Sequence, residues 1–355
     1  MALSRAWPRS DTHVLVELEN ADGSLVAGQW FADPAEVAAV VARTPQARAL
    51  GESGLVAQPN GADHRLPALF ELAGSPGARL LVHRPERRAV VRHPDGSGAT
   101  RYTKMVRRRR VDELVAGLRG IERLAATGGG FAVPHVVEHR RHQASVTCTA
   151  LPGESLFACG DGSGLARRWH AAGRAIAALH RGEPGPQVGT HDAAAEASVT
   201  LRWLGLATAH GLLDPLDIAD LLGDLREGPP GPLALLHRDL HDKQLLVDEA
   251  GGETSVGVLD LDTLAVGERA LDLANLLVHL ELRVAQGRLD ERRADRAADA
   301  FLAGAEVDLA TERRLGAHAT ACRLRLAAVY AFRPRWRWVS PVLLSRAREG
   351  TALPG

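Results

Sequence analysis

The pattern of hydrophobic and polar positions divides the first part of the chain into short elements. Residues 13–31 alternate as two strands, HVLVELE and SLVAGQWF, around the turn NADG, which predicts a β-hairpin. Residues 33–44 show helical apolar spacing after an Asp33 cap and a proline in the first turn. Residues 51–66 are rich in Gly, Pro and polar side chains, and we expect a connection there.

From residue 79 onward the pattern changes to strands and then to helices. RLLVHR, RAVVRH, TRYTKMVR, HVVEHRR and ASVTCTA read as strands, with a helix over about 110–126 between the third and fourth. After the break LPGE at 151–154 the chain reads as mainly helical, for example over 164–182, apart from short β-like runs near 233–262. Strands followed by helices predict an α+β fold. We expect an N-terminal accessory region at 1–76, a small lobe at 77–150 and a helical lobe at 151–355.

Composition excludes several classes of protein. The formal net charge is +0, so no overall field favours nucleic acid or an anionic membrane. No apolar run has the length of a signal peptide or a membrane span, and we expect a cytoplasmic protein. The three cysteines, Cys148, Cys159 and Cys322, lack metal-site spacing. The oligomeric state stays open.

Lysine is rare in this chain. Of 43 Lys and Arg residues only Lys104 and Lys243 are lysines, which leaves 43 − 2 = 41 arginines. A compact ammonium group and a planar guanidinium are not interchangeable where phosphates must be met. Both lysines lie in segments that carry candidate chemistry.

Those segments contain the parts that phosphoryl transfer needs. LLHRDLHDKQLLVD (235–248) is followed by VGVLDLDTL (256–264). A carboxylate must orient the attacking hydroxyl, and Asp239 is placed for that task. Gln244 and Asp260 offer oxygen ligands for Mg²⁺. Asp262 either reaches the same metal or bonds to the loop.

HRDLHDKQ with LDLD resembles the catalytic loop and metal motif of the aminoglycoside phosphotransferase/choline kinase family, relatives of protein kinases. That family usually reads H-G-D-x-H-x-x-N and then I-D-[WF]-[DE], and the resemblance covers roughly residues 77–340. It implies a bilobal protein-kinase-like fold with an N-terminal cap, ATP as donor with GTP not excluded, Mg²⁺, and catalytic roles for His237 and Asp239. Arg238 stands where Gly is usual. Gln244 stands where Asn is usual, as in bacterial maltokinase-like and glucosamine-kinase-like sugar kinases.

The downstream segment ALDLANLL resembles the family's D-L-A segment, and we expect Asp272 to brace the catalytic loop. Lys243 has two interpretations that stay open. It either contacts the γ-phosphate or is an exposed residue that pairs with Asp242 or Asp248.

The small lobe should hold the nucleotide. Strand alternation puts Tyr102, Lys104 and Val106 on one face, and the resemblance implies that Lys104 meets the α- and β-phosphates. Its carboxylate partner is expected on the following helix, where Glu122 lies on the apolar stripe and Glu113 is the alternative.

Two further nucleotide contacts follow from the resemblance. Thr149, Ala150 and Leu151 lie in a segment similar to the linker that offers backbone groups to adenine. The first hairpin lacks a glycine at its tip, and backbone amides with Arg87 or Arg88 are the alternative cover for the phosphates.

The acceptor is open to several interpretations. An Arg- and Trp-rich segment near the C-terminus, at 323–348, suits a sugar, an anionic metabolite or an acidic peptide better than a polycationic aminoglycoside, or it only covers the core. We expect a small-molecule acceptor, a sugar or amino sugar. The alternatives are an antibiotic phosphotransferase, a Ser/Thr kinase of a biosynthetic peptide, and a non-catalytic nucleotide-binding pseudokinase.

Overall fold

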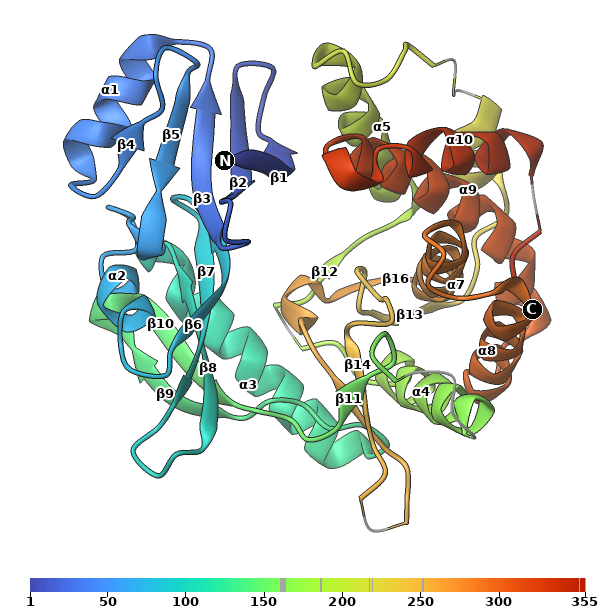
Figure 1. Cartoon of the computed structure of the whole chain (residues 1–355). Helices are drawn as coiled ribbons and strands as arrows, with labels where there is room; N and C mark the ends of the chain where they lie inside the picture. The colour runs from blue at the N-terminus through green and yellow to red at the C-terminus, as the bar shows by residue number, and fades with distance from the viewer. Residues whose placement is uncertain are drawn as a thin grey trace. The chain divides into compact units, whose positions relative to one another are not determined.

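The computed structural model describes residues 1–159, 164–185, 187–216, 218, 220–250, 252–350 and 352–354. The chain forms two compact units. The first comprises Met1–Arg119, Pro134–Ala150 and Phe332–Arg335, and the second comprises Gly120–Val133, Leu151–Ala331 and Trp336–Gly355. Figure 1 shows strands dominating the first unit and helices the second, which confirms the α+β class predicted from the sequence. Whether 1–76 is a domain of its own stays a prediction.

The first unit contains two antiparallel sheets. One has the strand order β1-β2-β3-β5-β4, and its strands are β1 (Ala2–Pro8), β2 (His13–Glu19), β3 (Leu25–Phe31), β4 (Arg48–Ala49) and β5 (Leu55–Gln58). Helix α1 (Pro34–Arg43) covers this sheet through Val40. Its first turn is capped by the Asp33 side chain, which accepts from the Ala35 N–H at 2.8 Å.

The other sheet has the order β6-β7-β8-β10-β9. Its strands are β6 (Arg79–Arg84), β7 (Arg88–Pro94), β8 (Thr100–Val106), β9 (Val136–Arg140) and β10 (Ser145–Thr149). Helix α2 (Leu69–Ala73) packs on the face that carries Val91 and Met105. The first half of α3 (Val111–Gly128) packs on the opposite face with Val146. The expected alternation in β8 is confirmed, because Thr103 and Met105 are buried against α2 and Lys104 points to the other face.

The second unit is built mainly of helices. They are α4 (Leu165–His180), α5 (Ala193–Ala209), α6 (Gly223–Glu227), α7 (Ala270–Ala285), α8 (Glu291–Gly304), α9 (Leu309–Ala331) and α10 (Val339–Glu349). Two small sheets accompany them, with the orders β11-β14-β15 and β12-β16-β13. Their strands are β11 (Glu154–Ser155), β12 (Gly189–Thr190), β13 (Leu233–Leu236), β14 (Leu245–Asp248), β15 (Ser255–Val258) and β16 (Ala265–Glu268). None of the described helices is long and apolar enough to cross a membrane.

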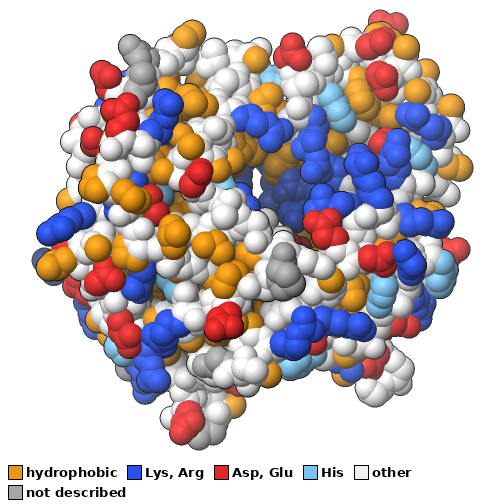
Figure 2. Space-filling view, turned by 180° about the vertical axis from the view of Figure 1, so that it is seen from behind, with side chains coloured by type: hydrophobic (Ala, Val, Ile, Leu, Met, Phe, Trp, Pro, Cys, Tyr) orange, Lys and Arg blue, Asp and Glu red, His pale blue; other side chains and the backbone are white. Residues whose placement is uncertain are grey.

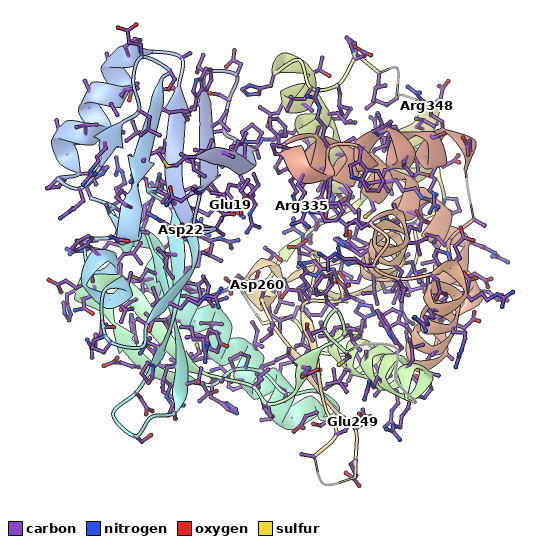
Figure 3. All side chains as sticks on the ribbon, in the orientation of Figure 1. Glu19, Asp22, Glu249, Asp260, Arg335 and Arg348 are labelled. Atoms are coloured by element: carbon purple, nitrogen blue, oxygen red, sulfur yellow. The ribbon has the colours of Figure 1, made fainter. Side chains whose placement is uncertain are left out.

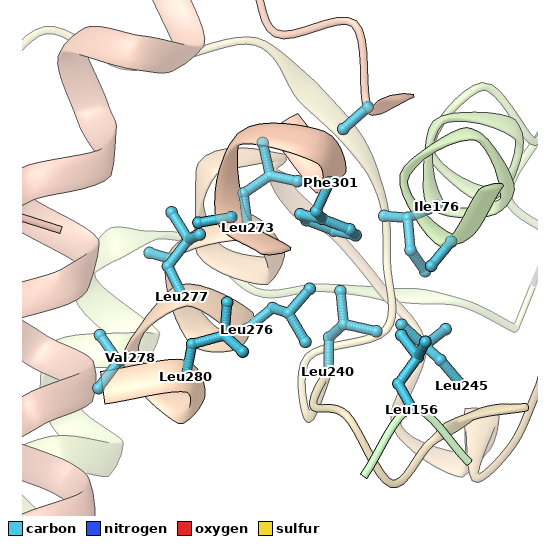
Figure 4. Close-up of a cluster of buried hydrophobic side chains, with 14 of the residues drawn as sticks. Leu156, Ile176, Leu240, Leu245, Leu273, Leu276, Leu277, Val278, Leu280 and Phe301 are labelled. Carbon is cyan, nitrogen blue, oxygen red and sulfur yellow. The ribbon is translucent and has the colours of Figure 1, made fainter. Parts of the chain in front are cut away.

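Helix α7 is the centre of the second unit, and its residues from Ala270 to Arg283 are all buried. Leu240, in the loop between β13 and β14, extends into the same core, beside Leu276 and near Leu156 and Leu245 (Figure 4). The loop that carries the expected chemistry is therefore anchored to the hydrophobic core in its middle, and its polar residues on either side of Leu240 are held in place.

Candidate active site

The predicted catalytic loop begins where β13 ends and runs from His237 to Gln244, after which β14 begins. Asp239 is exposed within it, whereas its neighbours His237 and Leu240 are fully buried. An exposed carboxylate between two anchored residues is available to a substrate and restricted in orientation. This is the arrangement that a hydroxyl-orienting group requires.

Asp272 braces the loop from below, as predicted. Its carboxylate is fully buried and accepts hydrogen bonds from the backbone N–H groups of His237 and Arg238, each at 2.7 Å. His180 Nε2 lies 3.0 Å from the same carboxylate. Burial alone would raise the pKa of Asp272, but His180 and the backbone donors outweigh it and hold the pKa below its usual value. Asp272 stays ionised and fixes the start of the loop.

Arg238 adopts a left-handed backbone conformation, with φ +70°. Glycine reaches this region without steric cost, which explains physically why a Gly is usual at this position. The surrounding contacts hold the strained residue in place. Besides the Asp272 contact, Asn275 Nδ2 donates to the Arg238 carbonyl at 3.2 Å, and Arg238 Nη1 donates to the Thr263 carbonyl at 3.3 Å.

His237 joins the catalytic loop to the segment that carries Asp260. Its Nε2 donates to the Leu259 carbonyl at 2.8 Å, and its Nδ1 accepts from the Asp239 N–H at 3.3 Å. The Leu259 N–H donates in turn to the Gln244 carbonyl at 2.9 Å. The peptide before Asp260 is thereby held between both ends of the loop. Because both ring nitrogens are engaged with backbone and the residue is fully buried, this geometry favours positioning rather than proton transfer for His237.

The hydrogen bond between the Leu259 N–H and the Gln244 carbonyl joins the two segments that carry the expected metal ligands, whose role stays a prediction. Asp260, labelled in Figure 3, is half-buried with φ +56°, and Asp262 is exposed in the short turn that follows. Within the described residues, no three His, Cys, Asp or Glu side chains gather as a metal cage. An amide oxygen from Gln244 and one or two carboxylates fit Mg²⁺, which completes its shell with water and phosphate oxygens.

The Gln244 amide nitrogen lies 3.5 Å from His241 Nε2. Burial lowers the pKa of His241, so its imidazole is neutral near pH 7. The Lys243 N–H donates to His241 Nδ1 at 3.2 Å, so in the neutral ring the proton lies on Nε2. That Nε2–H would meet the Gln244 amide through its oxygen, and a metal would have to compete with His241 for this oxygen. Metal ligation by Gln244 stays a prediction.

Lys243 is exposed and its Nζ lies 4.2 Å from the centre of the Phe157 ring. Arg283 and Arg288 also lie over that ring, at 4.8 and 5.2 Å. Asp242 is buried and accepts two hydrogen bonds from Arg283, each at 2.8 Å. The Asp242 carboxylate is therefore committed to Arg283, and Lys243 belongs to a cationic cluster around an aromatic ring.

The expected nucleotide contacts lie in both units. Lys104 is half-buried on β8 in the first unit, and Glu122 lies on α3 in the second. Glu113, the alternative partner, is exposed and forms an ion pair with Arg110 at 2.9 Å. The pairing of Lys104 with Glu122 stays a prediction.

The linker segment needs one refinement. The Thr149 N–H already donates to the His135 carbonyl at 2.9 Å, and Thr149 Oγ1 accepts from the His135 N–H at 2.9 Å. Backbone contacts with adenine would therefore come from Ala150 and Leu151 rather than from the Thr149 N–H.

Sequence analysis did not identify a cluster of four polar side chains beneath the loop, formed by Arg325, Asn275, Glu196 and His191. Arg325 Nη2 donates to Asn275 Oδ1 at 2.6 Å, and its Nε donates to Glu196 at 3.2 Å. His191 Nε2 lies 2.9 Å from the other Glu196 oxygen. Burial alone would lower the pKa of Arg325, but Glu196, with Asp239 among the other contributors, holds this pKa above its usual value. Asn275 lies inside the quoted ALDLANLL segment and Arg325 inside the Arg- and Trp-rich segment at 323–348, but nothing in the sequence placed them together or with Glu196 and His191.

The chain belongs to the phosphotransferase enzyme family (APH), whose model matches residues 74–329. The predicted membership is therefore confirmed. No curated protein matches the chain in sequence.

Solved structures of kinase-like phosphotransferases share its fold. Aminoglycoside phosphotransferase APH(3'')-Id from Streptomyces rimosus is 20% identical, with a TM-score of 0.52 over 74% of this chain and 98% of that one. A further structure of that protein holds ADP and streptomycin. A thermostable mutant of aminoglycoside phosphotransferase APH(4)-Ia is 16% identical, with a TM-score of 0.58 over 81% and 99% of the two chains. A choline/ethanolamine kinase family protein from Mesorhizobium loti is 18% identical, with a TM-score of 0.50 over 81% and 92%. These similarities confirm the kinase-like fold.

Proposed function

We propose that this phosphotransferase moves the γ-phosphate of ATP to a hydroxyl of a sugar or amino sugar, with Asp239 as the residue that orients the acceptor. The observation that carries the proposal is the pair of hydrogen bonds made by the Leu259 backbone, one to His237 and one to Gln244. These bonds hold the next residue, Asp260, beside the loop that carries Asp239. An acceptor-orienting carboxylate and a metal-binding carboxylate held by one backbone framework are the two parts that phosphoryl transfer requires.

The residues divide the reaction between them. Asp239 accepts the hydrogen bond of the acceptor hydroxyl and takes its proton as the new O–P bond forms and the bond to ADP breaks. Gln244 and Asp260, with Asp262, would hold Mg²⁺, which neutralises charge on the transferring phosphates. Lys104 and Glu122 are proposed to hold the nucleotide, with backbone groups of Ala150 and Leu151 at the adenine.

Local charge supports a sugar rather than a polycation as the acceptor. Lys243, Arg283 and Arg288 surround Phe157 next to the loop, and the nearest carboxylate of the loop, Asp242, is committed to Arg283. Several ammonium groups of an aminoglycoside would meet like charge there, which costs affinity. Sugar hydroxyls are compatible with this cationic cluster around an aromatic ring. Figure 2 shows one face of the molecule, on which some Lys and Arg side chains adjoin one another and others stand singly among Asp and Glu side chains.

The test is ADP formation by the purified protein with Mg²⁺ and ATP or GTP. The acceptor panel contains neutral sugars, amino sugars, uronic acids, aminoglycosides and a Ser-containing peptide. We expect turnover with sugars, and a fall in kcat of about 10²- to 10⁴-fold in Asp239→Asn. Asp248→Asn is the matched control, because Asp248 lies at the far end of β14 and accepts from the Ala250 N–H at 3.1 Å.

The other outcomes separate the alternatives. Turnover with aminoglycosides alone would identify an antibiotic phosphotransferase, and turnover with the peptide alone a Ser/Thr kinase. Binding of Mg-ATP without turnover of any acceptor would favour the pseudokinase.

A further inference from the structure

The hairpin of β6 and β7 carries a pair of arginines at its tip, where sequence analysis found no glycine. Arg84 pairs with Arg88, and Arg88 pairs with Val106 on β8. Directly paired residues point to the same face of a sheet. Val106 and Lys104 are two residues apart on β8 and therefore share a face. Both arginines consequently lie on the Lys104 face. Along the strand, Lys104 is only about 7 Å from Val106.

Arg84 stacks on an aromatic ring and forms no ion pair among the described residues. Its guanidinium carbon lies 3.2 Å from the centre of the Trp7 ring, and Arg5 lies 5.3 Å from the same ring. Its Nε atom is buried and has no hydrogen-bond partner. Across the part of the chain that the structure describes, Arg84 and Arg88 form no ion pair with a carboxylate, and Glu17 is paired with Arg5 at 2.6 Å.

The charges around Arg84 mostly repel it. Burial, followed by Arg88 and Arg5, lowers the pKa of Arg84 below its usual range, with Arg333 acting in the same direction and Glu17 opposing. A half-buried cation among other cations is unfavourable unless something negative joins it. A buried donor without a partner is rare in folded proteins and calls for an explanation. A bound anion explains both features at once.

The tip is held rigidly in position. The Asp63 carboxylate accepts from the Glu86 N–H at 2.6 Å and lies 3.1 Å from His83 Nε2. Arg107 Nε donates to the Glu86 carbonyl at 2.5 Å, and Arg65 Nε donates to the Glu86 side chain at 3.0 Å. The turn between Arg84 and Arg88 is therefore fixed at Glu86, and the backbone that carries both arginines is held in place for a ligand.

We propose that Arg84, stacked on Trp7, and Arg88 bind the polyphosphate chain of the nucleotide, and that this arginine pair does the work of a glycine-rich loop. The inference rests on the proposed function, since it assigns the ligand of the Lys104 face as a nucleoside triphosphate. Guanidinium groups bind phosphate oxygens through paired, charge-assisted hydrogen bonds. Trp7 comes from β1, so the N-terminal sheet contributes directly to this site.

Calorimetric titration of the full chain with inorganic tripolyphosphate tests the arginine site. Mg²⁺ is left out so that the metal-binding residues of the catalytic loop do not contribute to binding. The variants are Arg84→Met, which keeps an apolar stem on Trp7, and Arg88→Gln. The control is Arg92→Gln, an exposed residue on the same face of β7 but roughly 13 Å further along the strand. We expect each test variant to raise the Kd for tripolyphosphate and ATP about 10-fold, and the control to change it less than about two-fold because its charge is screened.

Two further readouts make the assignment specific. The affinity for AMP should change less than that for ATP, and tripolyphosphate should raise the Tm of the wild type and of Arg92→Gln but not that of Arg84→Met. If Arg84→Met fails to fold, the exposed Arg88→Gln carries the test alone. Equal tripolyphosphate affinity in Arg88→Gln and Arg92→Gln, or no binding by the wild type, would overturn the proposal. Arg84-dependent binding without turnover of any acceptor would keep the anion site and reject the proposed function.

Discussion

Arg238 shows how one backbone conformation is supported by its surroundings. A non-glycine residue at φ +70° is strained, and the strain persists only where other contacts fix it. Asp272, Asn275 and Thr263 supply those contacts, from α7 and from the turn after Asp260. The protein therefore uses three hydrogen bonds to keep an arginine where a glycine would suffice.

Replacing Arg238 separates strain from side-chain function. In Arg238→Gly we expect the lost Thr263 contact and the relieved strain to offset each other, so the free energy of unfolding changes by less than about 1 kcal/mol. In Arg238→Val a β-branched residue must adopt the same φ, and we expect a loss of about 2 kcal/mol. Denaturant unfolding of the pair measures this. Equal losses in both variants would show that the side chain, not the backbone, dominates.

Asp272 is expected to be the most sensitive support of the loop. In Asp272→Asn one amide oxygen must replace a carboxylate that now serves His237, Arg238 and His180. We expect a loss of about 3 kcal/mol in stability and a clear fall in kcat, because a buried network is broken and Asp239 is released. Asp308→Asn is the control, since that carboxylate also accepts a backbone N–H, from Thr311 at 2.7 Å, but at an exposed helix start. A loss in Asp272→Asn no larger than the control would refute the bracing role.

The candidate site could be predicted from the sequence where its residues are contiguous. Asp239, Gln244 and Asp260 fall within 22 positions, and the structure joins them through the Leu259 peptide. Arg325 and Glu196 could not be predicted, because their roles depend on α9 and α5 meeting beneath the loop. No spacing along the chain encodes such a meeting.

At the scale of elements, the close contact between helices α4 and α8 in the second unit depends on two glycines. Helices α4 and α8 approach each other at Gly173 and Gly304. A Cβ atom on Gly173 would lie 2.1 Å from the Phe301 carbonyl oxygen, and one on Gly304 would lie 2.1 Å from the His170 carbonyl oxygen. Backbone stands against backbone at both points, so neither contact can relax by moving a side chain.

We expect Gly173→Ala to cost about 3 kcal/mol, because α4 and α8 must separate to admit the methyl group. Gly205→Ala is the matched control. Gly205 lies in α5, and a Cβ atom there would meet no other atom within 4 Å, so alanine should stabilise the protein by up to about 1 kcal/mol through helix propensity. Thermal unfolding of the two variants gives the comparison. A mild effect in Gly173→Ala would mean that the helix pair is more adaptable than the packing indicates.

Periodicity predicted the longer elements well and the short ones poorly. The hairpin at 13–31, the helix over 34–43 and the strands of the β6–β9 sheet match the sequence pattern. Strand β5 and helix α2 lie in or near the stretch taken as a connection, and β1 was not predicted. These elements have four to seven residues, and cross-strand pairing or the Met105 face of the sheet holds them in place. Local propensity carries little information about such elements.

At the scale of the molecule, several arginines of the second unit are buried partners of carboxylates. Arg314 donates two hydrogen bonds to Glu268, and Arg323 does the same to Glu281. Arg283 holds Asp242 in the same bidentate way. A buried pair adds little when intact, but losing one partner leaves an uncompensated charge. Protonation of the carboxylates therefore becomes a route to unfolding.

Glu268 makes this acid sensitivity measurable. Burial alone would raise its pKa, but His318 and Arg314 outweigh burial and hold the pKa at about 2. The folded pKa lies below the unfolded value of about 4.3, so the stabilisation is complete above that pH and is lost as the pH falls toward 2. Glu268→Gln should cost about 3 kcal/mol at pH 7, and this deficit relative to the wild type should shrink progressively between about pH 4.3 and about pH 2. Urea titrations at a series of pH values measure it, with the exposed Glu291→Gln as control. If the stability deficit of Glu268→Gln instead stays constant down to about pH 2, the deficit comes from altered packing at residue 268. The ionised carboxylate would then contribute no stability through Arg314 and His318.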